Sequence, residues 1–258
     1  MGFSFDIDPT AFSIGGFDFS YYWLVYLAGF VVCIIFLLRA TKKNKIEMSE
    51  KEVYGFAVYF VIGLILGARA FYVIFWGGNF YWNNPIWIFL FWKGGMSFHG
   101  GLLGAFLTSF SYTNKKKINF LKVADILTLP ALFFLALGRI ANFFNQEIVG
   151  TVTNVPWCFN FRYDEGCKHP VQLYAAAGRF MLFGFLLWMK KSLKSFREGF
   201  IFWSFVFLIC VGRFILDFWR EDIRYFGLAS GQLISLVFIL IGLYVLKKHY
   251  WSDVKRVV

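Results

Sequence analysis

Charged residues are scarce in this sequence. Asp, Glu, Lys and Arg make up only 16% of the 258 residues, while 59% are hydrophobic and 23% are aromatic. In soluble globular chains about 25% of the residues are charged. The shortage of charge excludes an ordinary soluble domain and indicates a protein that is embedded in lipid.

Metal-type cysteine spacing and an N-terminal basic region are also missing. The four cysteines show no CxxC spacing, and we expect neither a metal site nor a cofactor. Cys33 and Cys210 fall in apolar runs, where a buried thiol is the ordinary state. Cys158 and Cys167 share one long loop, and both a disulfide and two free thiols remain open there. The first 20 residues contain no Lys or Arg, so they lack the n-region of a cleavable signal peptide, and we expect a short external leader.

Long apolar runs follow one another along the chain. A membrane-spanning helix needs about 20 apolar residues. Seven runs are candidates: 21–38, 53–76, 86–112 (with an interruption), 123–143, 171–189, 199–219 and 229–246. Backbone amides in hydrocarbon must be paired within their own segment, which favours helices over open sheets. The predicted fold is therefore all-α: a single integral membrane domain over residues 1–258 with seven transmembrane helices.

Basic residues alternate between the segments that join these runs. Segments 39–52, 113–122, 190–198 and 247–258 together hold 17 Lys and Arg, whereas 1–20, 77–85, 144–170 and 219–228 hold 4. The positive-inside rule then predicts an external N-terminus and a cytoplasmic C-terminus. The formal net charge of +11 is assigned to contact with anionic lipid headgroups, and no nucleic acid partner is expected.

Five basic residues remain inside the apolar runs: Arg69, Lys93, Arg139, Arg179 and Arg213. Each costs about 2.5–3.5 kcal/mol at the centre of a span, so such residues face the bundle interior or extend to an interface. We expect Lys93 to extend to the interface. Arg179 has no acidic residue near it in the sequence and receives no role.

Polar residues at helical spacing form two predicted stripes: Arg139, Asn142 and Gln146 in the first, and Arg213, Asp217 and Arg220 in the second. On an ideal helix the members of the first lie within about 60° of one another. Each stripe also has a structural interpretation, in which an Arg–Asp pair neutralises itself or an amide bridges two helices.

His99 lies between two glycine pairs in "GGMSFHGGLLG", residues 94–104. Glycine pairs break membrane helices or pack them closely, and a broken helix is tolerated only where protein or a wet cavity surrounds it. We expect His99 to line a cavity; the alternative is a neutral histidine that is hydrogen-bonded between helices.

The stretch "GRIANFFNQEIVG", residues 138–150, resembles the signature of the bacterial prolipoprotein diacylglyceryl transferase family, and "GGMSFHGGLLG" resembles that family's histidine motif. Further similarity follows in order along nearly the whole chain, in "FSIG", "YYWLVYLAGF", "GARAFYVIFW", "HPVQLYAA", "GRFILDFWRE" and "GQLIS". The resemblance implies the same seven-span fold with an external N-terminus. The chain departs from the family in having an aspartate, Asp217, where the family has glutamate, and in lacking the family's proline in "REDIRYFGLASGQ". Its outer loop between the fourth and fifth spans, "TVTNVPWCFNFRYDEGCKHP", is also short.

Position by position, the resemblance implies the residues of the site. Its catalytic residues are His99, Arg139 and Arg213, and its phosphatidylglycerol-binding residues are Tyr22, Arg139, Asn142, Glu147, Gly150, Arg213 and Asp217. His99 is either the base for a thiol or a positioning group. Tyr22 either binds phosphatidylglycerol or serves as an aromatic anchor at the membrane interface.

The activity that the resemblance implies is a group transfer of class EC 2.5.1 in the bacterial inner (plasma) membrane. Diacylglyceryl moves from phosphatidylglycerol to the lipobox cysteine of a preprolipoprotein signal peptide, which leaves a thioether and glycerol phosphate. The expected partners are these two substrates and membrane lipids, with the site near the outer leaflet. The polar residues suit this chemistry, because a thiol with a pKa of about 8.5 needs a base or a positive field and guanidinium groups suit a phosphate leaving group.

A transporter or channel that binds an anion at the arginines is the rival class. It would favour repeated, discontinuous helices, but the glycine-broken segment around His99 has no counterpart later in the chain. A purely structural membrane subunit is the third class, and it explains the charges inside the spans least well.

Overall fold

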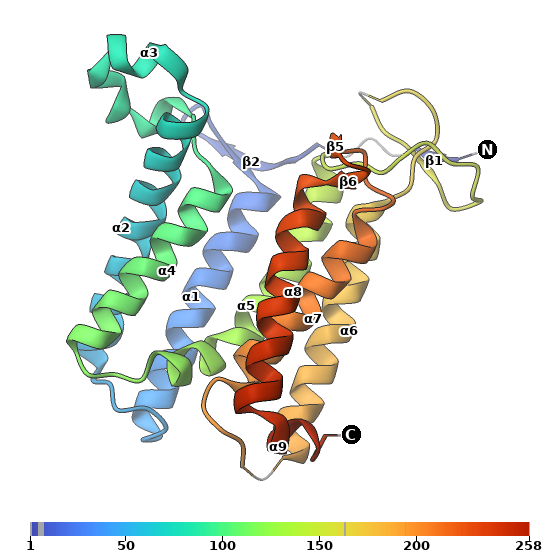
Figure 1. Ribbon diagram of the computed structural model, residues 1–258. Helices are drawn as coiled ribbons and strands as arrows, with labels where there is room; N and C mark the ends of the chain where they lie inside the picture. Colours follow the sequence, from blue (N-terminus) through green and yellow to red (C-terminus); the bar gives the residue numbers. More distant parts are fainter. Residues whose placement is uncertain (1, 5–7, 163, 194, 258) are drawn as a thin grey trace. The chain divides into compact units, whose positions relative to one another are not determined.

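The structure, a computed structural model, describes residues 2–4, 8–162, 164–193 and 195–257 (Figure 1). A helix lies in each of the seven apolar runs. These are α1 (Tyr21–Lys42), α2 (Glu50–Phe75), α4 (Phe98–Lys115), α5 (Phe120–Phe144), α6 (Val171–Ser192), α7 (Phe200–Leu216) and α8 (Ser230–His249). In the described residues, five of them, α1, α2, α5, α6 and α8, are long and apolar enough to cross a membrane. The prediction of a helical membrane protein is confirmed, while the count of seven spans stays a prediction.

Short elements precede, join and follow these helices. They are α3 (Gly78–Asn83), the 3-10 helices η1 (Pro85–Ile88) and η2 (Phe91–Lys93), α9 (Trp251–Val254), and the strands β1 (Phe3–Ser4), β2 (Thr10–Ile14), β3 (Phe17–Ser20), β4 (Phe159–Asn160), β5 (Arg224–Tyr225) and β6 (Leu228–Ala229). Within the described residues, the strands form three two-stranded sheets, in which β1 pairs with β4, β2 with β3, and β5 with β6. The interruption expected in the run 86–112 corresponds to η1, η2 and the glycines that follow them.

The chain forms two compact units. Unit 1 comprises Met1–Cys33 and Ala124–Val258, and unit 2 comprises Ile34–Val123.

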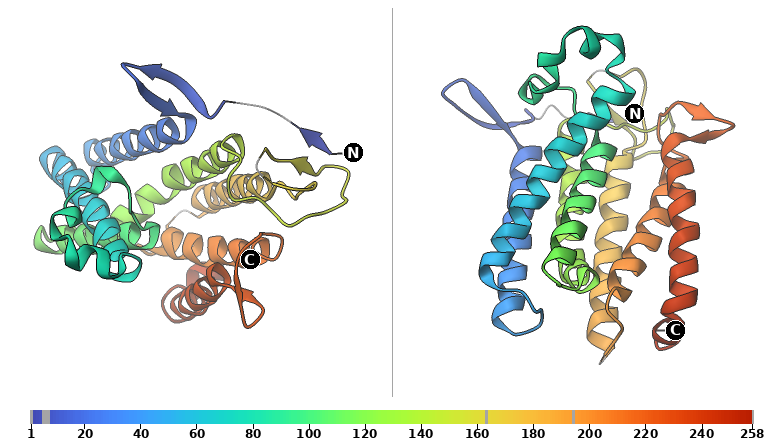
Figure 2. Two further views of the ribbon diagram at one scale, coloured as in Figure 1. Left: turned by 90° about the horizontal axis from the view of Figure 1, so that it is seen from above. Right: turned by 60° about the vertical axis from the view of Figure 1, so that its left-hand side comes forward.

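Unit 2 is held together by close packing of α2 against α4, which lie side by side in Figures 1 and 2. A Cβ atom on Gly104 would meet the backbone of Gly63 and would lie 2.8 Å from the Cα atom of Gly67. A Cβ on Gly100 would likewise meet the carbonyl oxygen of Gly67. Glycines allow the two backbones to approach, as small residues do in other membrane helix pairs.

In unit 1, α6, α7 and α8 pack in sequence order (Figure 2). The core at one end of these helices is built from large apolar side chains, among them Leu132, Leu186, Phe200 and Ile201. Buried Asp125 on α5 accepts hydrogen bonds from the backbone nitrogens of Gly199 (2.6 Å) and Phe202 (2.8 Å). This carboxylate satisfies amides at the start of α7 that have no partner within the helix, and it links α5 to α7.

Candidate active site

A cavity of about 400 Å³ lies in unit 1, lined by residues of α5, α6, α7 and the segment after α7. Most of its wall is apolar, with Leu182, Phe185, Leu208 and Ile209 among the lining residues. Among the described residues that line the cavity, the charged ones are Arg139, Arg179, Arg213, Arg220 and Asp217. Four guanidinium groups and one carboxylate leave a formal surplus of three positive charges in an apolar surrounding. Such a cavity suits an amphiphile with an anionic group.

Arg139 extends from the last turns of α5 and belongs to a chain of hydrogen bonds. Its Nη1 donates to Oδ1 of Asn142 (3.3 Å), and Nδ2 of Asn142 donates to Oε1 of Glu147 (2.7 Å). Asn145 Nδ2 donates to the same carboxylate oxygen (3.2 Å). Because Glu147 accepts from the amide nitrogen of Asn142, the amide oxygen is turned toward Arg139. The buried amide of Asn142 therefore orients the guanidinium.

Gln146 does not continue the stripe of Arg139 and Asn142, so that expectation was wrong. It assumed an ideal helix, but α5 ends at Phe144 and Gln146 has a φ of 55°, in the left-handed region. Its Oε1 instead accepts a hydrogen bond from the backbone nitrogen of Arg162 (2.6 Å). The turn brings Glu147 to Asn142 in place of Gln146.

Arg213 and Arg220 share one buried acid. Arg213 Nε lies 3.5 Å from Oδ2 of Asp217, and Arg220 Nη1 lies 4.0 Å from its Oδ1. Asp217 follows the last residue of α7, so Arg220 lies beyond the helix rather than on its face. The expected grouping of the three charges is confirmed, but the helical stripe ends at Asp217. Arg220 also pairs through Nε with Oδ2 of Asp222 (3.1 Å). Arg213, which shares its acid with Arg220, therefore keeps the greater capacity to bind a further anion.

Gly231, at the start of α8, lies against this ion pair. A Cβ atom there would meet Oδ2 of Asp217 and would lie 2.9 Å from Nη2 of Arg213. The motif "GQLIS" thus has a steric reason for its glycine, which the sequence alone did not reveal.

Gly150 lies where three backbone segments meet. Its nitrogen donates to the carbonyl oxygen of His169 (3.1 Å), and it forms an isolated antiparallel bridge with Arg220. A Cβ atom at this position would lie 2.5 Å from the carbonyl oxygen of His169 and 2.9 Å from that of Trp219. Gly150 therefore allows the segment after α5 to approach the cavity residue Arg220.

Tyr22 lies in the first turn of α1. Its ring centroid is 4.6 Å from that of Tyr26. Tyr26 in turn lies against α5, because a Cβ on Gly138 would be 2.9 Å from its hydroxyl oxygen. Tyr22 thus belongs to the same unit as the arginines, through a contact one residue before Arg139.

His99 lies in unit 2, in the first turn of α4, and its side chain is exposed there. Ser97 begins the helix by accepting a hydrogen bond from the nitrogen of Gly100 (3.4 Å). Gly94 and Gly95 have φ angles of 93° and 74°, which form the break before the helix. No residue in the described part of unit 2 hydrogen-bonds the imidazole, and the cavity expected around it stays a prediction.

Arg69 organises the segment that precedes α4. Its Nε donates to the carbonyl of Ile88 (2.9 Å), its Nη1 to those of Gly94 (2.6 Å) and Gly95 (2.9 Å), and its Nη2 to that of Trp87. The guanidinium is buried and takes the place of backbone partners that this irregular segment lacks. Sequence reasoning placed Arg69 inside a span but missed this role. The ammonium of Lys93, which we expected to extend to an interface, lies 4.5 Å from the Trp87 ring centroid.

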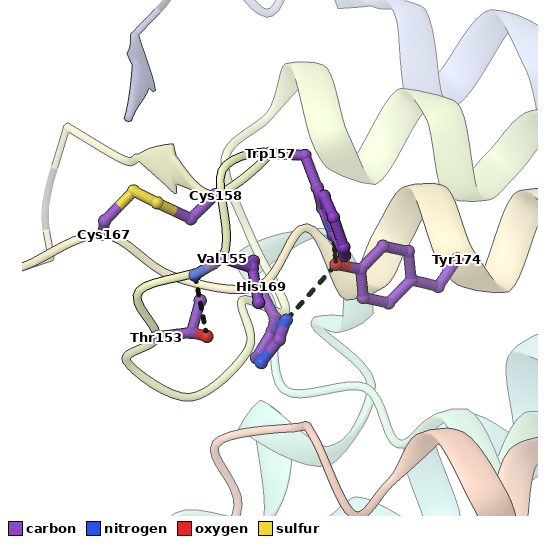
Figure 3. Close-up of a disulfide and its surroundings, with 7 residues drawn as sticks. All are labelled: Thr153, Val155, Trp157, Cys158, Cys167, His169 and Tyr174. Carbon is purple, nitrogen blue, oxygen red and sulfur yellow. Dashed lines mark hydrogen bonds between the residues drawn. A yellow bond between two sulfur atoms is a disulfide. The ribbon is translucent and has the colours of Figure 1, made fainter. Parts of the chain in front are cut away.

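The long loop between α5 and α6 contains a disulfide between Cys158 and Cys167, with their Cα atoms 5.5 Å apart (Figure 3). Of the two alternatives left open above, the structure contains the bridge. Beside it, Trp157 Nε1 donates to the Tyr174 hydroxyl (2.7 Å), which lies 3.2 Å from Nδ1 of His169 (Figure 3). Burial lowers the pKa of His169 and so favours its neutral form.

Two further residues of this region escaped the sequence analysis. Lys168 is buried and pairs with Asp164 (2.6 Å) and with Glu221, which follows α7. Burial by itself lowers the pKa of Lys168, but the hydrogen bonds and charges of the two acids outweigh it and raise the pKa. Gln172 donates from Nε2 to the carbonyl of Glu147 (2.8 Å). Lys168 lies directly before "HPVQLYAA" and Gln172 lies within it. This stretch attracted notice only through its resemblance to the family.

The fold and the cavity define a multi-pass helical membrane protein with a cluster of arginines in an apolar site. Residues 9–247 match the model of the family described as prolipoprotein diacylglyceryl transferase, and the chain belongs to this family. It is 37% identical over 243 residues to the phosphatidylglycerol–prolipoprotein diacylglyceryl transferase of Geobacter sulfurreducens, covering 92% of this chain and 93% of the relative. The protein of that name from Aeromonas salmonicida is 35% identical, over 97% of this chain and 91% of the relative. The one from Bordetella parapertussis is 36% identical, over 92% and 93%.

Proposed function

We propose that this chain transfers the diacylglyceryl group of phosphatidylglycerol to prolipoproteins, the reaction for which its relatives are named. The chain is thus a transferase of lipoprotein maturation and a multi-pass protein of the bacterial inner membrane. The observation that carries the site is that Arg139 of α5 and Arg213 of α7 line one cavity. Two arginines from two helices can bind a lipid phosphate from two sides.

The proposed topology has seven spans, an external N-terminus and a cytoplasmic C-terminus, with the 258 residues acting as one membrane domain. At about 1.5 Å per residue, the 18 residues of α4 and the 17 of α7 extend roughly 25–27 Å, near the thickness of the hydrocarbon core. The alternation of basic segments supports the orientation. With this proposed orientation, the end of α5 and the cavity beside it lie at the outer leaflet.

In the proposed reaction the nucleophile is the thiolate of the lipobox cysteine. Its sulfur attacks the glycerol carbon that carries the phosphate, a thioether forms, and glycerol phosphate leaves. Arg139 and Arg213 stabilise the leaving phosphate, since guanidinium groups in an apolar cavity interact strongly with developing negative charge. Asn142 and Glu147 hold Arg139 in place, as their hydrogen bonds of 3.3 and 2.7 Å suggest. Asp217 holds Arg213 in the same way.

The remaining site residues have supporting roles in this proposal. His99 is the candidate base that removes the thiol proton. Tyr22, in the first turn of α1, contributes to phosphatidylglycerol binding. Gly150 allows the backbone after α5 to approach the site. The amphiphilic substrates enter sideways between helices, because both are held in the membrane.

Vesicles that contain the purified protein, phosphatidylglycerol and a peptide with a lipobox cysteine test the proposal. Mass spectrometry should detect a diacylglyceryl thioether on the cysteine, together with released glycerol phosphate. A peptide with serine in place of that cysteine is the control and should stay unmodified. Solute flux across the vesicle membrane without thioether formation would instead support the rival transporter class.

A further inference from the structure

Arg179 lies in the cavity wall on α6 and has no role in the chemistry proposed so far. Its Nε and Nη1 atoms are buried and lack a hydrogen-bond partner among the residues that the structure describes. Arg139 and Arg213 differ, since each contacts a polar side chain of its own helix end. Two buried guanidinium nitrogens without partners are costly, and their position in a cavity indicates that a ligand supplies the partners.

We propose that Arg179 binds the second negative charge that appears on the phosphate when glycerol phosphate leaves. The inference rests on the proposed function, whose reaction generates this charge. The thiol gives its proton to the base, and a sulfur electron pair forms the bond to carbon. The carbon–oxygen bond to phosphate breaks, and its electron pair stays on the oxygen. A phosphodiester with one negative charge thereby becomes a phosphate monoester, which carries up to two at neutral pH.

The charges of the cavity fit this change. The groups that face Arg179 are Arg139 on α5, Arg213 on α7, Asp217 and Arg220 after α7, and Tyr26 on α1. Two arginines suffice for a phosphodiester. Asp222, which pairs with Arg220 (3.1 Å), lowers the surplus of this cluster from three positive charges to two. Two charges exceed the single charge of the phosphodiester and equal those of the product.

An interaction that strengthens as the bond breaks stabilises the transition state more than the bound substrate. Loss of Arg179 should therefore lower kcat and leave the KM for phosphatidylglycerol nearly unchanged. A purely structural arginine would instead change the amount of folded protein.

Binding of two soluble headgroups to the purified full-length protein tests the proposal by calorimetry at pH 5 and pH 8. Glycerol phosphate has a second pKa of about 6, so only roughly a tenth of it is doubly charged at pH 5. Wild-type protein should bind it about tenfold more tightly at pH 8. Glycerophosphoglycerol, a phosphodiester, keeps one charge at both pH values, so its affinity reports any titration of the protein itself.

In Arg179→Gln the gain for glycerol phosphate should fall below about twofold, while binding of the phosphodiester stays within about twofold of wild type. Arg256→Gln, the same change at a half-exposed side chain near the C-terminus, is the matched control and should keep the full gain. If Arg179→Gln does not accumulate, Arg179→Met takes its place, with the same expectation.

Equal affinity of wild-type protein for glycerol phosphate at both pH values overturns the inference without any variant. A tenfold gain that survives the loss of Arg179 overturns it as well. Diacylglyceryl transfer by wild-type vesicles is measured in parallel. Transfer without the gain leaves the proposed function standing and refutes the role of Arg179, whereas an Arg179-dependent gain without transfer supports the anion site and refutes the function.

Discussion

Replacement of Gly150 by alanine should destabilise unit 1 and impair the site. The added Cβ would lie 2.5 Å from the carbonyl oxygen of His169, 2.7 Å from its Cβ and 2.9 Å from the carbonyl oxygen of Trp219. Two of these three atoms belong to the backbone, so a side-chain rotation cannot relieve the clash. The segment after α5 has to move away from α6 and from the end of α7.

The size of the effect follows from this geometry. Overpacking of a tight site costs about 1–3 kcal/mol. The movement also strains the bonds from Gly150 N to His169 O (3.1 Å) and from Thr151 N to Trp219 O (2.8 Å). In a chain of this size each kcal/mol lowers the melting midpoint by about 2–4 °C. We expect a fall of several degrees in detergent, and a loss of transfer activity because Gly150 is bridged to Arg220.

Thermal unfolding of the purified protein and transfer per folded molecule are the two measurements. Gly184→Ala on α6 is the matched control, since nothing lies within 4 Å of a Cβ there. Alanine favours a helix over glycine by about 1 kcal/mol, so the control should be as stable as wild type or slightly more stable. A Gly150→Ala protein with the wild-type midpoint and normal transfer would refute the argument from close approach.

Three further predictions concern the other parts of the chain. Reporters fused after Lys45 should indicate the cytoplasm and one after Asp164 the outside; the reverse pattern would contradict the topology drawn from basic residues. His99→Gln keeps the size of the side chain but removes the titratable base, so transfer should fall by roughly 10²–10⁴, and near-normal turnover would assign His99 to positioning. Mass spectrometry of non-reduced peptides should find Cys158 linked to Cys167, and two free thiols would contradict the bridge.

The helices were largely predictable, because a helix that crosses a lipid bilayer needs a long, nearly continuous run of apolar residues. The apolar run 171–189 became α6 (Val171–Ser192), and the run 123–143 became α5 (Phe120–Phe144). The end of α5 was harder to predict from the sequence. No glycine or proline lies at this end. Gln146 and Ile148 have positive φ angles there, but glutamine and isoleucine rarely adopt the left-handed conformation, so the sequence does not indicate the turn.

The site was predictable where its members are neighbours in sequence. Arg139 with Asn142, and Arg213 with Asp217, were grouped correctly from helical spacing. Arg179 could not be assigned, because the other charged residues of its cavity come from other segments of the chain. Contacts between helices depend on how the helices pack, which the spacing of residues within one helix does not reveal.

Conservative substitution of Arg139 and Arg213 is the sharpest test of phosphate binding in the cavity. Membrane abundance and diacylglyceryl transfer are measured together for Arg139→Lys, Arg213→Lys and the corresponding alanine variants. Lysine keeps the charge but cannot make two parallel hydrogen bonds to a phosphate. We expect the lysine variants to accumulate normally yet lose most activity, and the alanine variants to lose more. Lysine variants that are well folded and fully active would contradict phosphate binding by Arg139 and Arg213.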